Sequence, residues 1–283
     1  MGRRRTILVG AAALAVAAGA FLFARAVRRE SAPANTGDAW TRPKPARPVA
    51  FPDGEALLYE FGLNGVAAAT LRVCTTLGTD AGAAVLTVTY DIRSSPAIET
   101  LWQYSATGRS LIDERTLLPV RSERSSESGE KQKSVSVVFD RPAGMARIER
   151  RRSAQGRVKK REKPCAGLDD MASALLLLRS IDMDAGGGAR LLVLSGEDVY
   201  EVLATPAGEE EISVAAGVFQ ARAVDMALRE VVEPDESDEP KSRQARIWLA
   251  RDRGVPVRLA SEVLLGEVYA ELQEVGPAAP AGE

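Results

Sequence analysis

The stretch AVLTVTYDI, residues 84–92, alternates apolar and polar side chains from Leu86 to Ile92. A repeat of two residues places alternate side chains on opposite faces of an extended chain, which is typical of an antiparallel strand with one buried face. The stretch therefore predicts a β-protein whose strand over 84–92 turns one apolar face to the core, formed by Leu86, Val88, Tyr90 and Ile92.

The same alternation recurs along most of the chain after residue 50. Turn-forming segments rich in Gly, Pro, Ser and Asp separate the alternating runs, which indicates strands joined by short hairpins. We predict roughly ten to twelve strands in up-and-down order, too many to stay flat, and hence a mainly β fold with a curled antiparallel sheet or incomplete barrel. The clearest further runs are KSVSVVFD (133–140), ARIWLA (245–250) and VPVRLA (255–260).

One segment, LDDMASALLLLRSI (168–181), has the pattern of a helix instead. Asp169 or Asp170 is suited to cap its N-terminus, and Arg179 lies in the last turn, where a cation suits the helix dipole. About fourteen residues flanked by charges are too few to span a bilayer. Because the four consecutive leucines at 175–178 cover more than one face, we predict one short helix packed in the concavity of the sheet.

The first 29 residues predict a membrane anchor or a signal segment. The uncharged run TILVGAAALAVAAGAFLFA (6–24) is flanked by arginines on both sides, and as a helix it reaches roughly 28 Å, enough to span a bilayer core. The segment FARA (23–26) offers small residues for cleavage, but an arginine lies between them. Both alternatives, an uncleaved transmembrane helix and a cleaved signal, stay open.

The remaining organisation follows from composition. Residues 30–50 form a Pro/Ala-rich linker, residues 51–275 a β-rich envelope domain, and residues 276–283 a disordered tail. This order predicts an inner-membrane anchored protein with its domain on the periplasmic side, or a protein secreted to the periplasm if the signal is cleaved.

The charge balance and the absence of histidine narrow the functional classes. A formal net charge of -2 provides no general attraction for nucleic acid, so no nucleic-acid partner is expected. With no histidine in the chain, Ser-His and Cys-His nucleophiles and most zinc sites are excluded. We therefore expect no cofactor, no metal and no catalytic residue.

The segment 146–163 is strongly basic, with nine cationic side chains against two glutamates. A hairpin turning at 153–156 would present them as a basic ribbon suited to anionic headgroups, lipopolysaccharide or an acidic partner. The alternative is a solvated edge hairpin whose charges prevent strand pairing with other chains. The candidate residues for anionic-surface binding are Arg150, Arg151, Arg152, Lys159 and Lys160. An acidic stretch at 229–240 predicts a disordered loop between strands.

Three further features leave alternatives open. Cys74 and Cys165 are either a long-range disulfide or two buried free thiols. Asp169 and Asp170 are better explained as helix-capping residues than as a catalytic carboxylate pair. Trp102 and Trp248 are core-lining aromatics with a possible role on a ligand face.

Four segments in order resemble the exported bacterial family called domain of unknown function 3108. They begin FPDGEALLYEFGLNGVAAATLRV and LDDMASALLLLRSID, continue with ISVAAGVFQARAV, and end in ARIWLARDRGVPVRLASEVLLGEVYAEL. The family helix carries a D-x-x-S-x-L-Y-Y-L-R pattern, in which leucines replace both tyrosines here. The resemblance implies an envelope protein of mainly antiparallel β-structure with no assigned activity, and it provides no support for a role that needs an aromatic on this helix.

We therefore expect a non-enzymatic envelope protein that carries a lipid or another amphipathic envelope molecule in an apolar concavity closed by the helix. The candidate cavity residues are Leu175, Leu176, Leu178, Trp102 and Trp248. A structural or interaction protein that docks through the basic hairpin is the alternative, and a carboxylate-based hydrolase is the third class.

Overall fold

The alternating runs of the first half form eight consecutive strands. The computed structural model of the protein describes residues 42–45, 54–99, 103–153, 156–181, 183, 187–231, 242–263 and 266–277. A one-turn helix, α2 (Pro96–Glu99), lies between the third strand and the fourth; it was not predicted, because four residues carry no periodic signal. The strands are β1 (Glu55–Leu63), β2 (Val66–Asp80), β3 (Ala83–Ser94), β4 (Tyr104–Asp113), β5 (Pro119–Ser128), β6 (Lys131–Asp140), β7 (Met145–Arg152) and β8 (Arg157–Pro164).

The second half contains the predicted helix followed by six strands. The helix is α3 (Met171–Ser180), preceded directly by the short strand β9 (Leu168–Asp170). The last strand reaches Pro277, so the domain extends two residues past the predicted end at 275, and the predicted tail 276–283 begins with paired residues. The strands are β10 (Ala189–Ser195), β11 (Asp198–Val214), β12 (Gly217–Glu230), β13 (Ser242–Ala250), β14 (Pro256–Val263) and β15 (Gly266–Pro277).

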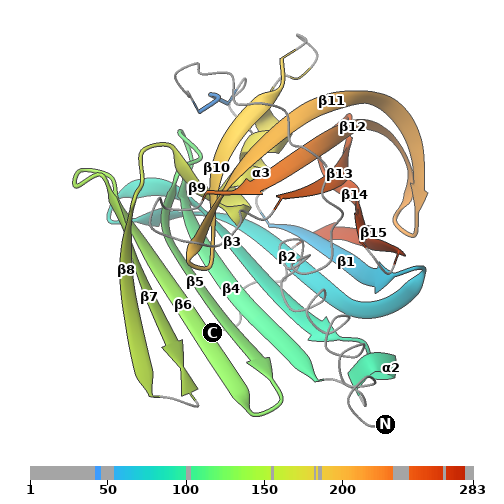
Figure 1. The fold of residues 1–283 in the computed structure, drawn as a ribbon. Helices are drawn as coiled ribbons and strands as arrows, with labels where there is room; N and C mark the ends of the chain where they lie inside the picture. The colour runs from blue at the N-terminus through green and yellow to red at the C-terminus, as the bar shows by residue number, and fades with distance from the viewer. Residues whose placement is uncertain are drawn as a thin grey trace.

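Together these strands form a single curled sheet. Among the described residues it contains fifteen strands in the order β8-β7-β6-β5-β4-β3-β2-β1-β15-β14-β13-β12-β11-β10-β9. The mainly β class and the up-and-down order are confirmed, and the strand number exceeds the predicted range. In Figure 1, β3 to β8 form one wall, while the long strands β11 and β12 arch over the opposite side, with α3 between the two. The sheet is therefore barrel-shaped and nearly closed.

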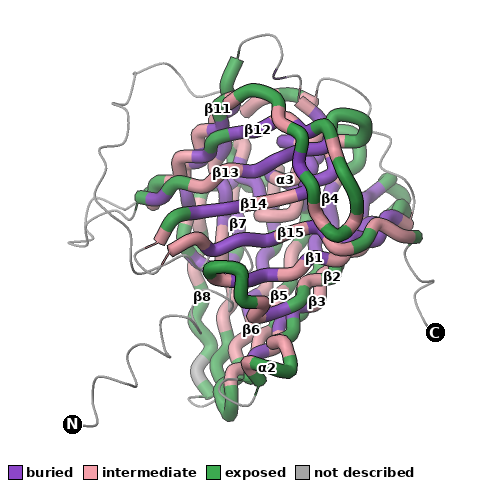
Figure 2. The backbone as a smooth tube through the Cα atoms, turned by 90° about the vertical axis from the view of Figure 1, so that its right-hand side faces the viewer, coloured by how far each residue is buried: buried purple, intermediate pink, exposed green. Residues whose placement is uncertain are grey.

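The buried faces follow the predicted alternation. Leu86, Val88 and Ile92 on β3 are buried, as are Val135 and Val137 on β6. Figure 2 shows the buried segments concentrated around α3. The main core cluster joins side chains of β3 and β4 to side chains of β10 to β13 through the leucines of α3. The prediction that this helix packs in the concavity of the sheet is confirmed.

The predicted anchor or signal (1–29), most of the linker (30–50) and Trp102 lie outside the described residues. None of the helices in the described ranges is long and apolar enough to cross a membrane. Residues 42–45 of the predicted linker are described, and Arg42 contacts the domain at the N-terminal end of α3.

Candidate functional site

An apolar cavity lies between α3 and the curled sheet. Its volume is about 310 Å³, within the range found for small-molecule sites. Most of its wall is hydrophobic, and it is partly open to solvent. Both halves of the sheet contribute to this wall, with Leu57, Leu71 and Val88 from β1 to β3 and Leu191, Val202 and Ile247 from β10, β11 and β13.

Three of the helix leucines lie on the wall of this cavity. Leu175, Leu176 and Leu178 line it, as sequence analysis expected of them. Leu177 does not line the cavity; it is 0% exposed and packs into the main core cluster. The helix thus uses one side to fix itself in the core and another to form the cavity wall.

Trp248, the tryptophan that can be placed, lies in the core as predicted, but away from this cavity. Trp248 is buried in a second core cluster, and it is not among the side chains that line the cavity. Its indole nitrogen donates to Glu210 at 3.1 Å, and the guanidinium groups of Arg246 and Arg258 lie over its ring. Trp248 faces away from the cavity because Ile247 and Leu249, its neighbours on β13, turn toward α3.

Tyrosines supply part of the wall where aromatics were expected. Tyr59 and Tyr90 line the cavity, and burial raises the pKa of both phenols. The Tyr59 hydroxyl donates to the carbonyl of Pro256 at 2.8 Å, so its polar atom is satisfied inside the protein. The ring of Tyr90 lies over Gly108, where an added Cβ would approach it to 2.3 Å. Both tyrosines therefore present neutral rings to the cavity.

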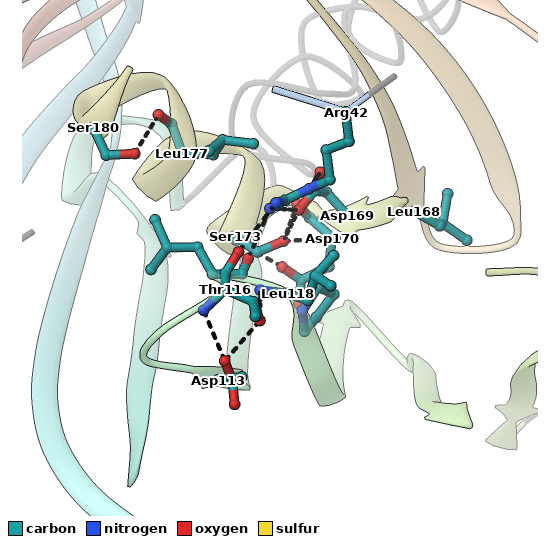
Figure 3. A network of polar contacts seen from close by, with 12 residues as sticks. Arg42, Asp113, Thr116, Leu118, Leu168, Asp169, Asp170, Ser173, Leu177 and Ser180 are labelled. Atoms are coloured by element: carbon teal, nitrogen blue, oxygen red, sulfur yellow. Dashed lines mark hydrogen bonds and ion pairs between the residues drawn. The ribbon is translucent and has the colours of Figure 1, made fainter. Parts of the chain in front are cut away.

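The N-terminus of α3 is held by a polar network, shown in Figure 3. Asp170 is the N-cap: its side chain accepts from the backbone N–H of Ser173 at 2.8 Å, and the Ser173 hydroxyl accepts from the N–H of Asp170 at 3.0 Å. Ser110 on β4 donates to the other carboxylate oxygen of Asp170. This reciprocal capping box confirms the capping interpretation and ties the helix to the first wall.

The neighbouring Asp169 is fully buried and pairs with an arginine from the predicted linker. Arg42 donates to both carboxylate oxygens of Asp169 at 2.8 Å, and also to the carbonyls of Thr116 and Leu117 at 3.1 and 3.0 Å. Leu117 has a left-handed backbone with φ of 53°. Arg42, in the predicted linker, is thus docked on the domain.

The C-terminal end of α3 is held by a second buried ion pair. Arg179 donates to the two carboxylate oxygens of Glu55 on β1 at 2.7 and 2.9 Å. The two side chains are only 3% and 2% exposed. The sequence predicted a favourable dipole interaction for Arg179 but gave no sign of this partner, which is 124 residues away.

Burial raises the pKa of Asp170, so its protonation is linked to folding. Between the unfolded and the folded pKa, the folded state keeps a proton that the unfolded state has lost, and stability therefore falls as the pH rises through that window. We expect Asp170→Asn, which retains an N-cap acceptor, to flatten this fall in urea unfolding followed at several pH values. Asp170→Ala should flatten the fall in the same way and be about 1 kcal/mol less stable than Asp170→Asn at every pH, because the cap is gone. An unchanged pH profile in Asp170→Asn would contradict the linkage.

The basic hairpin forms as predicted, but its charges divide between two faces. β7 and β8 pair antiparallel, with Arg152 opposite Arg157 at the turn. Arg150 and Arg152 follow the buried Ile148 at intervals of two, so they lie on the concave face with Lys159, which is opposite Arg150. Three of the five candidate cations, Arg150, Arg152 and Lys159, therefore face the inside of the sheet.

The other two candidate cations lie on the outer face and have acidic neighbours. Arg151 donates to Glu149 at 2.6 Å, and Lys160 lies 3.8 Å from the same carboxylate. Both cations are exposed, at 68% and 78%. The cations of the predicted ribbon thus divide between two faces, because alternation along each strand separates residues that are adjacent in the sequence.

The concave cations of β7 and β8 lie close to Glu197, which belongs to the other half of the sheet. Glu197, in the turn between β10 and β11, forms an ion pair with Arg150 and lies 4.0 and 3.7 Å from Lys159 and Arg161. Apolar residues of β6 and β7 pack beside this turn. The two edges of the sheet are therefore brought together by side chains.

The two cysteines are free thiols, so the disulfide alternative is not realised. Cys165 is buried beside Phe139 and Leu168, whereas Cys74 lies half-buried on β2. In the described part of the chain, no three His, Cys, Asp or Glu side chains gather as metal ligands. The acidic loop prediction falls largely on residues 232–241, outside the described ranges.

A buried helix held at both ends inside a nearly closed sheet, above an apolar cavity, defines a barrel-like β-protein with an internal cavity. The chain belongs to the family described as Protein of unknown function (DUF3108), whose model matches residues 58–273. The resemblance identified from the sequence is confirmed. No curated protein matches the sequence.

A solved structure shares the fold at low sequence identity, and two others match with lower scores. A beta-barrel-like protein of domain of unknown function DUF1849 from Brucella abortus superposes with a TM-score of 0.54 at 9% identity, covering 80% of this chain and 98% of its own. A protein from Parabacteroides distasonis, provisionally described as a lipoprotein, has a TM-score of 0.37 at 10% identity, covering 81% and 98%. A provisionally described exported protein with a YmcC-like fold from Bacteroides fragilis has a TM-score of 0.35 at 13% identity, covering 79% and 96%.

Proposed function

We propose that this protein is a non-enzymatic envelope protein that binds a lipid or another amphipathic molecule in the cavity beneath α3. The observation that carries the proposal is the cavity itself, whose apolar wall is built by both halves of the sheet and by one side of a leucine-rich helix. Displacing water from such a wall favours binding of an acyl chain by roughly 0.8 kcal/mol for each buried methylene group.

The N-terminal sequence supports an envelope location for this activity. The uncharged run at 6–24 suits either export or membrane anchoring, and either would bring the domain to a compartment where amphipathic lipids are abundant. In this proposal the anchored form works at the inner membrane on the periplasmic side, and a lipid or lipopolysaccharide-like molecule is the cargo.

An interaction protein that docks an acidic surface through its outer hairpin is less well supported. Arg151 and Lys160, which such a surface would meet first, already share the carboxylate of Glu149. A hydrolase based on Asp169 and Asp170 is also less well supported, because these carboxylates are engaged in an ion pair and a helix cap.

We expect Leu175→Gln to weaken binding of a neutral amphiphile about tenfold, because it places an amide on the apolar wall without an assigned partner. Leu175 is suitable because it is half-buried, whereas Leu176 and Leu177 are so buried that a polar substitution would also unfold the core. The measurement is calorimetric titration of the full chain, held in amphipol, with glycerol monolaurate.

The matched control is Leu77→Gln, the same substitution at a leucine on β2 that is 43% exposed and does not line the cavity. It should bind the probe as the unmodified protein does. Equal affinity in both variants would place the probe elsewhere, and a failure of the unmodified protein to bind glycerol monolaurate and other amphiphiles would reject the proposed function.

A further inference from the structure

The concave face of the first wall carries a row of cations that crosses four strands. In the register of the sheet, Arg124 on β5 is opposite Val135, Val135 is opposite Arg150, and Arg150 is opposite Lys159. Residues opposite each other across neighbouring strands lie on the same face, with side chains about 5 Å apart. Arg124, Arg150 and Lys159 therefore point into the same concavity.

A second row continues this surface. Lys133 on β6 is opposite Arg152 on β7, one pleat further from the core than the first row. The diagonal distance from Lys133 to Arg124 and to Arg150 is about 7 Å by the same geometry. We call the set formed by Arg124, Lys133, Arg150, Arg152 and Lys159 the concave cation patch.

The charge within this patch is unbalanced. Lys133 is repelled by Arg124, Arg150 and Arg152 and attracted by one carboxylate, that of Glu197. Partial burial, together with the three guanidinium groups, lowers the pKa of Lys133. Like charges placed opposite and diagonal to one another destabilise a sheet. On the outer face of the hairpin, Glu149 offsets the neighbouring cations. On the inner face the excess of positive charge lowers the stability of the fold, and a bound anion would remove this repulsion.

The patch is continuous with the apolar cavity. Arg124 is both a member of the patch and part of the cavity wall, beside Tyr90 and Ser122. Its guanidinium donates to the Tyr104 hydroxyl at 3.1 Å, which fixes it on this wall. From this point the ends of β5 to β8 extend beyond the buried region, and in Figure 2 they are largely half-buried or exposed. The patch therefore lies where the cavity meets solvent.

We propose that the concave cation patch binds the anionic headgroup, a carboxylate or phosphate, of an amphiphile whose chain occupies the cavity. This inference rests on the proposed function and specifies its ligand class. Guanidinium and ammonium groups form strong charge-assisted hydrogen bonds with carboxylate and phosphate oxygens. An apolar wall on one side and an unbalanced set of cations on the other match the two parts of such a molecule.

The test compares headgroups on a constant chain. The full chain in amphipol is titrated with three probes that share a twelve-carbon chain, namely lauric acid, glycerol monolaurate and dodecyltrimethylammonium, and separately with inorganic phosphate. We expect lauric acid at a pH where it is ionised to bind at least about tenfold more tightly than glycerol monolaurate, since charge-assisted hydrogen bonds add to burial of the same chain. The cationic probe should bind most weakly, and inorganic phosphate should bind far more weakly than lauric acid.

The variant pair is Lys133→Gln with Arg152→Gln, matched by Lys160→Gln with Arg151→Gln. Both pairs remove two positive charges from the same hairpin region, the first from the concave face and the second from the outer face. We expect the concave pair to weaken lauric acid binding about tenfold or more and to leave glycerol monolaurate unchanged. The same pair should raise the thermal unfolding midpoint of the ligand-free protein, because it relieves like-charge repulsion.

The possible results separate the two proposals. Equal binding of lauric acid and glycerol monolaurate, unaffected by the concave pair, would overturn the headgroup assignment and leave the cavity function standing. Phosphate binding as tight as that of lauric acid, lost in the concave pair, would show an anion site independent of the cavity and would also overturn the inference. Failure of all three chain-bearing probes would reject the proposed function itself.

Discussion

Arg42→Ala is expected to lower the free energy of unfolding by about 3–5 kcal/mol, although residue 42 lies in a segment that reads as a linker. Asp169 is 0% exposed, and Arg42 neutralises it through two hydrogen bonds of 2.8 Å. Without Arg42, a charged carboxylate would remain inside the protein, and two carbonyls of the β4–β5 turn would lose their donor. Urea unfolding, compared at constant slope, measures the loss.

The matched control is Lys44→Ala, which removes an exposed cation two residues away in the same segment. It should change stability by less than about 0.5 kcal/mol. Introducing Asp169→Asn into the Arg42→Ala variant should recover part of the loss, since the uncompensated charge is then absent. A small effect of Arg42→Ala, similar to that of Lys44→Ala, would show that the docked segment does not contribute to the fold.

The second large effect is expected at the other end of α3. Glu55→Ala should cost about 3–5 kcal/mol, because it leaves the guanidinium of Arg179 buried without its carboxylate. The comparison is Glu267→Ala, which removes the carboxylate of the pair Arg258–Glu267 at 2.7 Å on the exposed part of the sheet. That loss should stay below about 1 kcal/mol, since exposed ion pairs contribute little.

A double substitution shows whether the loss in Glu55→Ala comes from the unpaired charge of Arg179 or from the absence of the ion pair itself. Glu55→Leu combined with Arg179→Met replaces both charges by apolar side chains of similar length, which is often neutral or favourable in buried sites. We expect the double variant to be more stable than the single Glu55→Ala variant by several kcal/mol. A double variant as unstable as the single one would mean that the pair itself, and not the lone charge, determines the position of the helix.

The strands and the helix were predictable because their signals are local. Alternation identified β3, β6, β13 and β14 and their buried faces, and the capping residues identified the start of α3. The strand number was underestimated because strands such as β5, whose residues are mostly polar on both faces, carry little alternation of hydrophobicity. The family resemblance was also readable, since its motifs lie in the same order along the chain.

The ion pairs of the helix were not predictable from local patterns. Arg42 pairs with a residue 127 positions away, and an isolated arginine before the proline at position 43 has no periodicity to reveal its partner. The division of the basic hairpin was different, because its signal was present. Counting in steps of two from Ile148 places Arg150 and Arg152 on the buried face, a step that the high charge of the segment obscured.

The strand order has a consequence for the way the chain folds. Every antiparallel pair joins consecutive strands except β1 with β15, whose residues are about two hundred positions apart, for instance Leu63 with Val268. Hairpins with short loops close rapidly, whereas contacts between distant residues require the closure of a long loop and slow the transition state. We expect the two meanders, β2 to β8 and β10 to β14, to gain protection against hydrogen exchange early in refolding. The β1–β15 ladder should be protected last, which would make it the step that commits the chain to its native topology.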